Sequence, residues 1–370
     1  MTEHHSPQSR MRSYLQLVAT GPELSKSLNR DQAEDAIGMI LDGEIDPVRS
    51  GIFLIALRMK RETDAENLGA LDALLKRTTQ ASAVAGEILA VSDPFNGYNR
   101  GIPATPFLPA VFAACGLPAY ANGLRRAGPK YGVTINMVLD AAGKIVDMDP
   151  VKGAAQLDNP DIGWTYMDQS VYAPALHELV GLREKMVKRC VISTLEVVLK
   201  PLSGNLKTHL MTGFVHKAYP PVYTALARHA DYESAMIIRG VEGGSIPSLS
   251  QVSRYFGYDG NDEMTMHKLS PASIGIEQQA RSISLEDEFE TLAGQSGYEN
   301  TQVLTPIVEK TVELGLAALS GKAGPMHDSL VYGAAIGLSH TGLCDSMEEG
   351  ARIARMKLQS GEAADRFKNG

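Results

Sequence analysis

The chain has 370 residues, of which 44% are apolar and 21% charged, and its formal net charge is −8. A chain of this length can bury a large core and usually divides into two domains. The acidic net charge argues against a wholly basic nucleic-acid binder, although it allows a local basic groove.

The cysteines Cys115, Cys190 and Cys344 form no C-x-x-C pair, so we expect no disulfide framework and a cytoplasmic location. The N-terminus lacks the apolar region of a signal peptide, and no apolar run approaches the roughly 18 residues that span a bilayer, so we expect no membrane partner.

The first eighty residues predict a small helical domain. Residues 1–10 are polar, and we expect them to be disordered. Asn29–Gln32 resembles a capping box, Asp46-Pro47 starts a second helix, and Thr63–Glu66 is an S/T-x-x-E capping box before a third. Three short helices with brief connections form a small bundle.

The next stretch predicts a βαβ unit. Ile88–Val91 is a short apolar run that predicts a buried strand, and the turn-forming cluster Asp93–Gly101 follows it. Thr105-Pro106 predicts a capped helix that continues to about Cys115. Leu117–Ala121 predicts a second strand, and Asn122–Arg126 a second polar loop. Both loops follow the carboxyl ends of strands, where open α/β sheets place their ligands.

The remainder of the chain alternates strands with helices. A polar segment rich in Asp and Pro is interpreted as a linker that runs to about Gly163. The pattern predicts helices at Thr134–Ala142, from Tyr172 to about Lys188, at Leu285–Ala293 and at Thr305–Ser320, helices opening near Gly324 and Ser346, and strands at Trp164–Gln169, His209–Val215 and Ser234–Ile238. This alternation implies an α/β fold, with a mostly parallel sheet flanked by helices. We place the small helical domain at residues 1–80 and the large α/β domain at residues 81–370.

Two motifs carry a resemblance to a known family. Phe53–Lys60 followed by Glu62-Thr63 closely matches the motif FLVALRMKGET, and the second loop keeps Gly123, Arg125 and Lys130 of a KHGNR…S-x-S-K-x-G pattern. From about Ala33 to Ala363 the chain resembles the anthranilate phosphoribosyltransferase (TrpD-like) family, glycosyltransferase family 3. The resemblance implies a nucleoside phosphorylase/phosphoribosyltransferase-like fold. It also implies that roughly residues 165–190 pack back onto the small domain and that this domain forms a homodimer through Ile52–Met59 and Leu68–Leu75.

The chain departs from that family where the family binds its phosphoribosyl donor. The glycines of the GTGGD loop are missing, and Asn96–Arg100 looks more like the YbiB-type branch, which keeps the fold, lacks the phosphoribosyl-pyrophosphate motif and is associated with nucleic-acid binding. The family's Asp-Glu pair corresponds to Ser245-Ile246, so Glu242 is the nearest carboxylate. One carboxylate is a poor Mg²⁺ site unless substrate phosphates supply most of the ligands. Both parts of the donor site are therefore degraded.

The polar and cationic residues that remain suit a phosphate-bearing ligand. Arg183 falls where the family has an arginine that contacts the acceptor, and Arg189 matches the family's next arginine. Lys185, Lys188 and Arg189 have the spacing of one helix face, and the turn Gly240–Gly244 could form an anion nest. The alternative is that these side chains are solvated charges paired with the chain's 43 acidic residues. The candidate phosphate- or ligand-binding residues are Asn96, Gly97, Arg100, Gly123, Arg125, Lys130, Arg183, Arg189, Arg239 and Glu242.

Two functions follow from these residues. The first is binding of a phosphate-rich ligand, either a phosphorylated small molecule or a single-stranded nucleic acid, in the cleft between the domains. The alternative is an active pentosyl or phosphoribosyl transferase with a donor site rearranged around Arg125, Lys130 and Glu242, and Mg²⁺ is expected only in that case. The missing Gly-rich loop and Asp-Glu pair favour binding, while the net charge and the retained Arg125, Lys130 and Arg183 favour a small phosphorylated substrate. No catalytic residue and no protein metal site is assigned.

Overall fold

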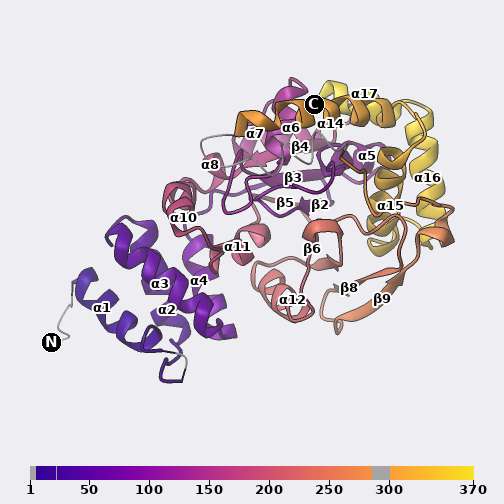
Figure 1. Cartoon of the computed structure of the whole chain (residues 1–370). Coiled ribbons are helices and arrows are strands. Elements are labelled where there is room, and N and C mark those ends of the chain that lie inside the picture. Colours follow the sequence, from indigo (N-terminus) through magenta and orange to yellow (C-terminus); the bar gives the residue numbers. More distant parts are fainter. Residues whose placement is uncertain (1–5, 22, 286–300) are drawn as a thin grey trace.

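The computed structural model describes residues 6–21, 23–285 and 301–370. A small helical bundle lies beside a larger α/β part (Figure 1), and it consists of α1 (Pro7–Val18), α2 (Arg30–Leu41), α3 (Pro47–Lys60) and α4 (Asp64–Leu75). The capping boxes at Asn29 and Thr63 are confirmed, because in each the cap side chain and the residue three positions later exchange hydrogen bonds. The expected disorder of residues 1–10 is wrong from Pro7 onward, since Ser6 caps α1 and Met11 is fully buried.

The sheet of the larger part has seven strands. Their order is β4 (Trp164–Asp168), β3 (Ala119–Gly123), β2 (Glu87–Ser92), β6 (Lys207–Gly213), β7 (Ser234–Ile238), β8 (Ser253–Asp259) and β9 (Thr265–Leu269). The first five run parallel, and β8 and β9 are antiparallel to their neighbours. A separate parallel pair joins β1 (Ala81–Ser82) to β5 (Leu202–Ser203). The mostly parallel sheet and its position after a helical domain are confirmed, while the antiparallel edge was not predicted.

Helices cover both faces of the sheet. Leu89 and Val91 of β2 face one core, and Ile88 and Ala90 face the other, as the two-residue period of a strand requires. The first face carries α5 (Leu108–Ala114), α6 (Ile135–Ala141), α14 (Thr305–Leu319), α15 (Pro325–His340), α16 (Met347–Gln359) and α17 (Glu362–Asn369). Figure 1 shows α15 and α16 on the side away from the bundle. The second face carries α7 (Pro150–Asp158) and α12 (Tyr219–His229), and its core continues into the bundle.

Several boundaries differ from those that the sequence predicts. The helix expected from Tyr172 to Lys188 is three short helices, α8 (Gln169–Tyr172), α9 (Pro174–His177) and α10 (Val180–Met186). The last helix ends because Val187 adopts a left-handed conformation with φ of 57°. Lys188 and Arg189 therefore lie beyond the helix and do not share a face with Lys185. The expected linker contains α7, and the predicted helix Leu285–Ala293 falls, apart from its first residue, outside the described residues.

Besides the shared apolar core, α10 and a hydrogen-bonded contact at Asp72 join the bundle to the larger part. Leu182 and Met186 of α10 line the same surface as Gly51 of α3. Asp72 of α4 accepts hydrogen bonds from Arg30 of α2 and lies 2.6 Å from Nε2 of His229 on α12. We propose that the domain boundary lies near residue 80, with α10 as the segment that returns to the bundle.

His340 makes the fold sensitive to acid. Its Nε2 lies 2.9 Å from Ser234 Oγ, and burial, reinforced by His209 and His267, lowers its pKa to about 4. Between pH 6.5 and pH 4 the unfolded chain therefore binds a proton that the folded chain does not, so stability falls as the pH drops through this window.

We predict that His340→Gln reduces the loss of unfolding free energy between pH 7 and pH 5 by about 1–2 kcal/mol. The measurement is chemical denaturation at both pH values, with the exposed His216→Gln as the control variant. Equal pH dependence in wild type and His340→Gln would contradict the assignment.

Candidate functional site

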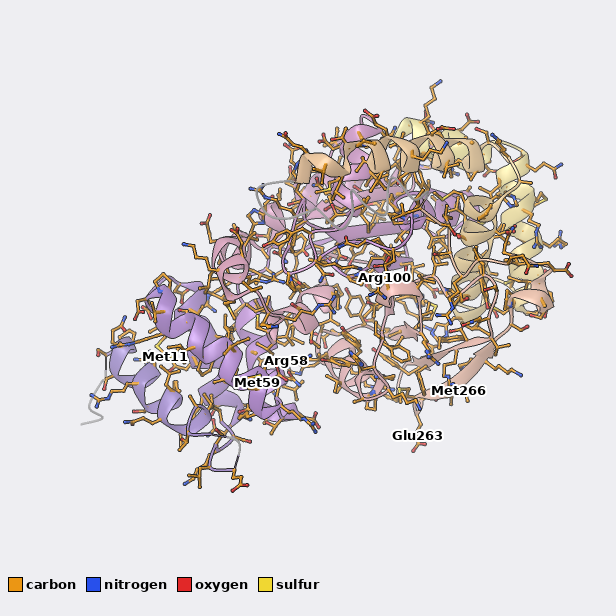
Figure 2. The ribbon with its side chains drawn as sticks, in the orientation of Figure 1. Met11, Arg58, Met59, Arg100, Glu263 and Met266 are labelled. Carbon is orange, nitrogen blue, oxygen red and sulfur yellow. The ribbon has the colours of Figure 1, made fainter. Side chains whose placement is uncertain are left out.

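A cavity of about 150 Å³ opens where the bundle meets the carboxyl ends of β2, β6 and β7. Arg58, near the end of α3, lines it from the edge of the bundle that faces the larger domain (Figure 2). Arg189 lies just before α11 (Ile192–Leu195), and His216 lies in the loop after β6. Apolar and aromatic side chains complete the walls, among them Phe95, Phe214, Tyr219 and Tyr223. The site is therefore a partly apolar pocket with cations on more than one side.

The two arginines of the pocket have different partners. The Asn96 amide oxygen, placed so that both groups are satisfied, accepts from Nη2 and Nε of Arg189 at 2.8 and 3.2 Å. The Arg58 guanidinium lies 5.8 Å from the centre of the Tyr219 ring and 3.6 Å from Glu62. An arginine bonded to a neutral amide keeps its charge available to an anion, so Arg189 is the strongest candidate for a phosphate contact.

Arg183 does not face this pocket as the resemblance implied. Its side chain is 4% exposed and donates to both oxygens of Glu196 at 2.7 Å. Gln169 donates to the same carboxylate at 3.2 Å. A buried bidentate pair of this kind is held for structure, since removal of one partner leaves an uncompensated buried charge. The pair also neutralises Glu196, which lines the pocket.

The loops after β2 and β3 are fastened to each other. Tyr98 and Val133 exchange backbone hydrogen bonds of 3.0 and 2.9 Å, and Gly132 N donates to Asn96 O. Gly97 has φ of 72°, and a Cβ there would collide with the Gly132 carbonyl, so glycine is required at this position. The cavity between these loops, which Gly97 and Gly123 line, measures about 10 Å³. This volume is close to the limit for one water molecule, so these two glycines do not cradle a phosphate here.

Glu242 joins a third loop to the first two. Its Oε1 accepts from the backbone N of Arg100 at 2.7 Å, and its Oε2 accepts from the backbone N of Asn99 at 3.1 Å. The same Oε2 forms an ion pair with Lys130 Nζ, and the Glu242 side chain is 8% exposed. Burial lowers the pKa of the Lys130 ammonium, and the charge of Glu242 opposes that effect. Two backbone amides from one loop and the ammonium group of a second loop therefore surround one carboxylate.

A second carboxylate, that of Asp93, joins the loop after β2 to the loop after β7. Asp93 Oδ1 accepts from the backbone N and Oγ of Ser245, both at 2.8 Å, and its Oδ2 accepts from Tyr98 OH at 2.6 Å. The Tyr98 hydroxyl stands where a Cβ on Gly244 would be. Burial, with the charge of Asp93, raises the pKa of Tyr98 well above its usual value. Tyr98 thus fills the space between the β2 and β7 loops and is not available to stack on a base.

Arg125 and Arg239, which the sequence grouped with Lys130, are not brought to the pocket. Arg125 is exposed and pairs with Asp140 of α6 at 2.7 Å. Arg239 is also exposed, and its backbone is held to β8, because its N donates to Arg254 O and its O accepts from Ser253 Oγ. The antiparallel strand β8, which the sequence did not predict, therefore holds the Arg239 backbone at the sheet edge and not at the pocket.

The Gly-rich turn after β7 is likewise not an anion nest. Gly240, Val241, Gly243 and Gly244 all donate their amide hydrogens to carbonyls of this loop and of β7. In the loop after β2, the amides of Asn99 and Arg100 do hold an anion, the Glu242 carboxylate.

Sequence reasoning also missed Arg58 and His216. Arg58 lies within the motif Phe53–Lys60, which the sequence analysis treats as a dimer segment. The charged Arg58 within that apolar motif is the signal that could have identified it as a pocket residue.

The comparison with protein families agrees with this architecture. Residues 12–78 match the helical bundle domain of the glycosyl transferase family, and residues 104–364 match the a/b domain of that family. The chain belongs to the TrpD-like glycosyl transferase family. The anthranilate phosphoribosyltransferase of Erythrobacter litoralis is 26% identical over 94% of this chain and 96% of its own length. That of Haloferax volcanii is 25% identical over 95% and 97%, and an uncharacterized protein of Aquifex aeolicus is 24% identical over 90% and 94%.

Solved structures show that the TrpD-like fold extends over the whole chain. Anthranilate phosphoribosyltransferase from Saccharomyces cerevisiae in complex with PRPP and Mg superposes with a TM-score of 0.73, at 16% identity, over 99% of this chain and 98% of that one. The enzyme from Thermus thermophilus gives a TM-score of 0.71 at 17% identity, over 98% and 97%. No helix among the described residues combines the length and apolar character needed to cross a membrane.

The side chains of this TrpD-like pocket do not fit a magnesium site. Ser245 and Ile246, the residues expected from the sequence to replace a carboxylate pair, are both buried and offer no carboxylate. The pocket carboxylates Glu196 and Glu242 are each committed to a cation. Among the described residues there is no group of three or more His, Cys, Asp or Glu side chains that could hold a metal ion.

Proposed function

We propose that this chain is a binding member of the TrpD-like family and that it takes a phosphate-bearing ligand into the pocket between the bundle and the sheet. The observation that carries the proposal is the placement of Arg58, Arg189 and His216 around one cavity whose carboxylates are already neutralised. A net positive pocket in an acidic protein concentrates anions locally. The three free cysteines support a reducing, cytoplasmic location.

Single-stranded nucleic acid is the candidate ligand that this proposal favours. Arg100 and Lys188 are exposed on loops next to the pocket, so a strand that reaches Arg189 inside it could also meet charge outside it. Such a ligand binds through its phosphates with strong salt dependence. A phosphorylated small molecule would use the same pocket without the outer residues, and the two cases differ in how affinity changes with strand length.

The second candidate function is phosphoribosyl or pentosyl transfer. It is supported by relatives that are anthranilate phosphoribosyltransferases over their full length and by a small, partly apolar pocket. One observation opposes this function. The space between the loops is filled, because Tyr98 and Ser245 both donate hydrogen bonds to Asp93.

We also propose that the chain forms a homodimer through α3 and α10. Val48 and Ile52 are 70% and 47% exposed, and they line an open apolar surface with Leu182 and Met186. The other segment that the resemblance suggested, Leu68–Leu75, contributes its buried leucines to the core of its own chain. The dimer contact is therefore assigned to the first segment and to α10.

The first prediction concerns the pocket arginines. Arg189→Ala and Arg58→Ala should each weaken binding of a 5′-phosphorylated single strand about tenfold or more, because each removes a charge-assisted contact. For a nucleic-acid ligand, each lost phosphate contact should also flatten the plot of log affinity against log salt by about 0.7. The measurement is fluorescence anisotropy over a salt series, with Arg239→Ala as a matched arginine control. If Arg239→Ala weakens binding as much as Arg189→Ala, the pocket assignment is wrong.

The second prediction concerns catalysis. We expect turnover of anthranilate with phosphoribosyl pyrophosphate and Mg²⁺ to fall far below the ~1–1000 s⁻¹ of typical enzymes. The reason is that the loop glycines and the carboxylate pair are replaced by packed, mutually bonded side chains. A discontinuous assay of the purified protein measures this, and turnover within that range would establish the transferase function instead.

The third prediction concerns assembly. Light scattering should show a dimer for the wild type and a monomer for Ile52→Asp, because a carboxylate in an apolar interface would be desolvated without a partner. Met266→Asp serves as the control, since Met266 is similarly exposed at the far end of the molecule (Figure 2). A wild-type monomer at every concentration would refute the dimer.

A further inference from the structure

The carboxylate of Glu242 occupies a site that has the composition of a phosphate-binding site. Two successive backbone amides, those of Asn99 and Arg100, each donate to a different oxygen of this carboxylate, and Lys130 adds an ammonium group. Adjacent amides that point at one anion form a nest, and a nest with a lysine is a common way to bind phosphate. The bound anion in this structure belongs to the protein itself.

The loops that carry Glu242 and Lys130 each contain a residue in a backbone conformation of raised energy. Glu242 has φ of 53°, and Tyr131, next to Lys130, has φ of 47°. Residues other than glycine adopt this left-handed region at an energetic cost, which must be offset by surrounding contacts. The Glu242 side chain supplies such contacts, and replacing it by another anion would leave the positive groups satisfied.

We propose that Glu242 is a built-in competitor that fills an anion site until a terminal phosphate of the ligand displaces it. The inference rests on the proposed function, because Glu242 also lines the ligand pocket and the incoming anion would enter from there. Displacement moves the carboxylate away from Lys130 and places a phosphate against the same two amides. The exchange replaces the hydrogen bonds and ion pair of Glu242 by those of the phosphate, and no covalent bond is made or broken.

The site around Glu242 is largely buried, and this limits which kind of anion can reach it. The Glu242 side chain is 8% exposed, and that of Lys130 is 19% exposed. A group at the end of a molecule can reach such a position, whereas an internal phosphodiester has chain leaving on both sides. The ligand chemistry is therefore a terminal phosphate or pyrophosphate, which a phosphorylated small molecule and the 5′ end of a nucleic acid both offer.

The test compares wild type with Glu242→Gln, which keeps the size of the side chain and removes its charge. Isothermal titration calorimetry would use inorganic pyrophosphate and two single strands of one sequence, with a 5′-phosphate and with a 5′-hydroxyl. Glu263→Gln is the matched control, because Glu263 is exposed at the lower edge of the larger domain in Figure 2. Glu242→Gly is a second variant whose backbone suits φ of 53°, in case the glutamine variant does not fold.

We expect Glu242→Gln to bind pyrophosphate and the 5′-phosphorylated strand about tenfold more tightly than wild type, since it removes a competitor that holds the site closed. The 5′-hydroxyl strand and Glu263→Gln should show no gain, and Lys130→Met should abolish the gain in the double variant. A gain for pyrophosphate alone would identify the source of the phosphate as a small molecule.

Unchanged or weaker pyrophosphate binding by both Glu242 variants would overturn the inference. If wild type still bound single strands with Arg189 dependence, the proposed function would survive that result. If no protein bound any of the three probes, the proposed function would fail together with the inference.

Discussion

The contact of the Glu242 carboxylate with the backbone amides of Asn99 and Arg100 and with the Lys130 ammonium is the constraint on which the site depends. It joins the loops that follow β2, β3 and β7, which no shared strand or helix connects at this edge of the sheet. The Tyr98–Val133 backbone bridge and the hydrogen bonds of Asp93 join these loops without Glu242, so the loops stay joined when a ligand displaces the carboxylate. A site whose loops are already joined loses little conformational entropy when a ligand binds, and this favours binding.

The fold is shared with anthranilate phosphoribosyltransferases, so a function has to be inferred from the loop side chains and not from the fold. The sheet, its two covering layers and the bundle are those of the TrpD-like relatives. In this chain Tyr98 fills the gap beside Gly244, and the Ser245 hydroxyl donates a hydrogen bond to Asp93. What remains open is the cavity nearer the bundle, where Arg58 enters from α3. Fold therefore does not decide the function here, and the residues in the loops do.

Much of the fold was predictable because local signals and burial agree. The run Ser234–Ile238 was assigned to its strand, and the capping box at Thr63 fixed the start of α4. The site was less predictable, because charged residues with similar local patterns have different partners in space. Nothing near Arg183 in the sequence indicates that Glu196 will bury it, and Arg239 is diverted by an antiparallel strand whose pairing depends on distant residues. The residues that form the anion nest act through backbone amides, which leave no trace in residue type.

The most direct test of the central claim is a crystal structure of the wild-type protein grown with inorganic pyrophosphate. The account predicts pyrophosphate density against the amides of Asn99 and Arg100 and beside Lys130, with the Glu242 side chain turned away from all three. Pyrophosphate bound at the Gly240–Gly244 turn or among the exposed arginines, with Glu242 still paired to Lys130, would contradict it.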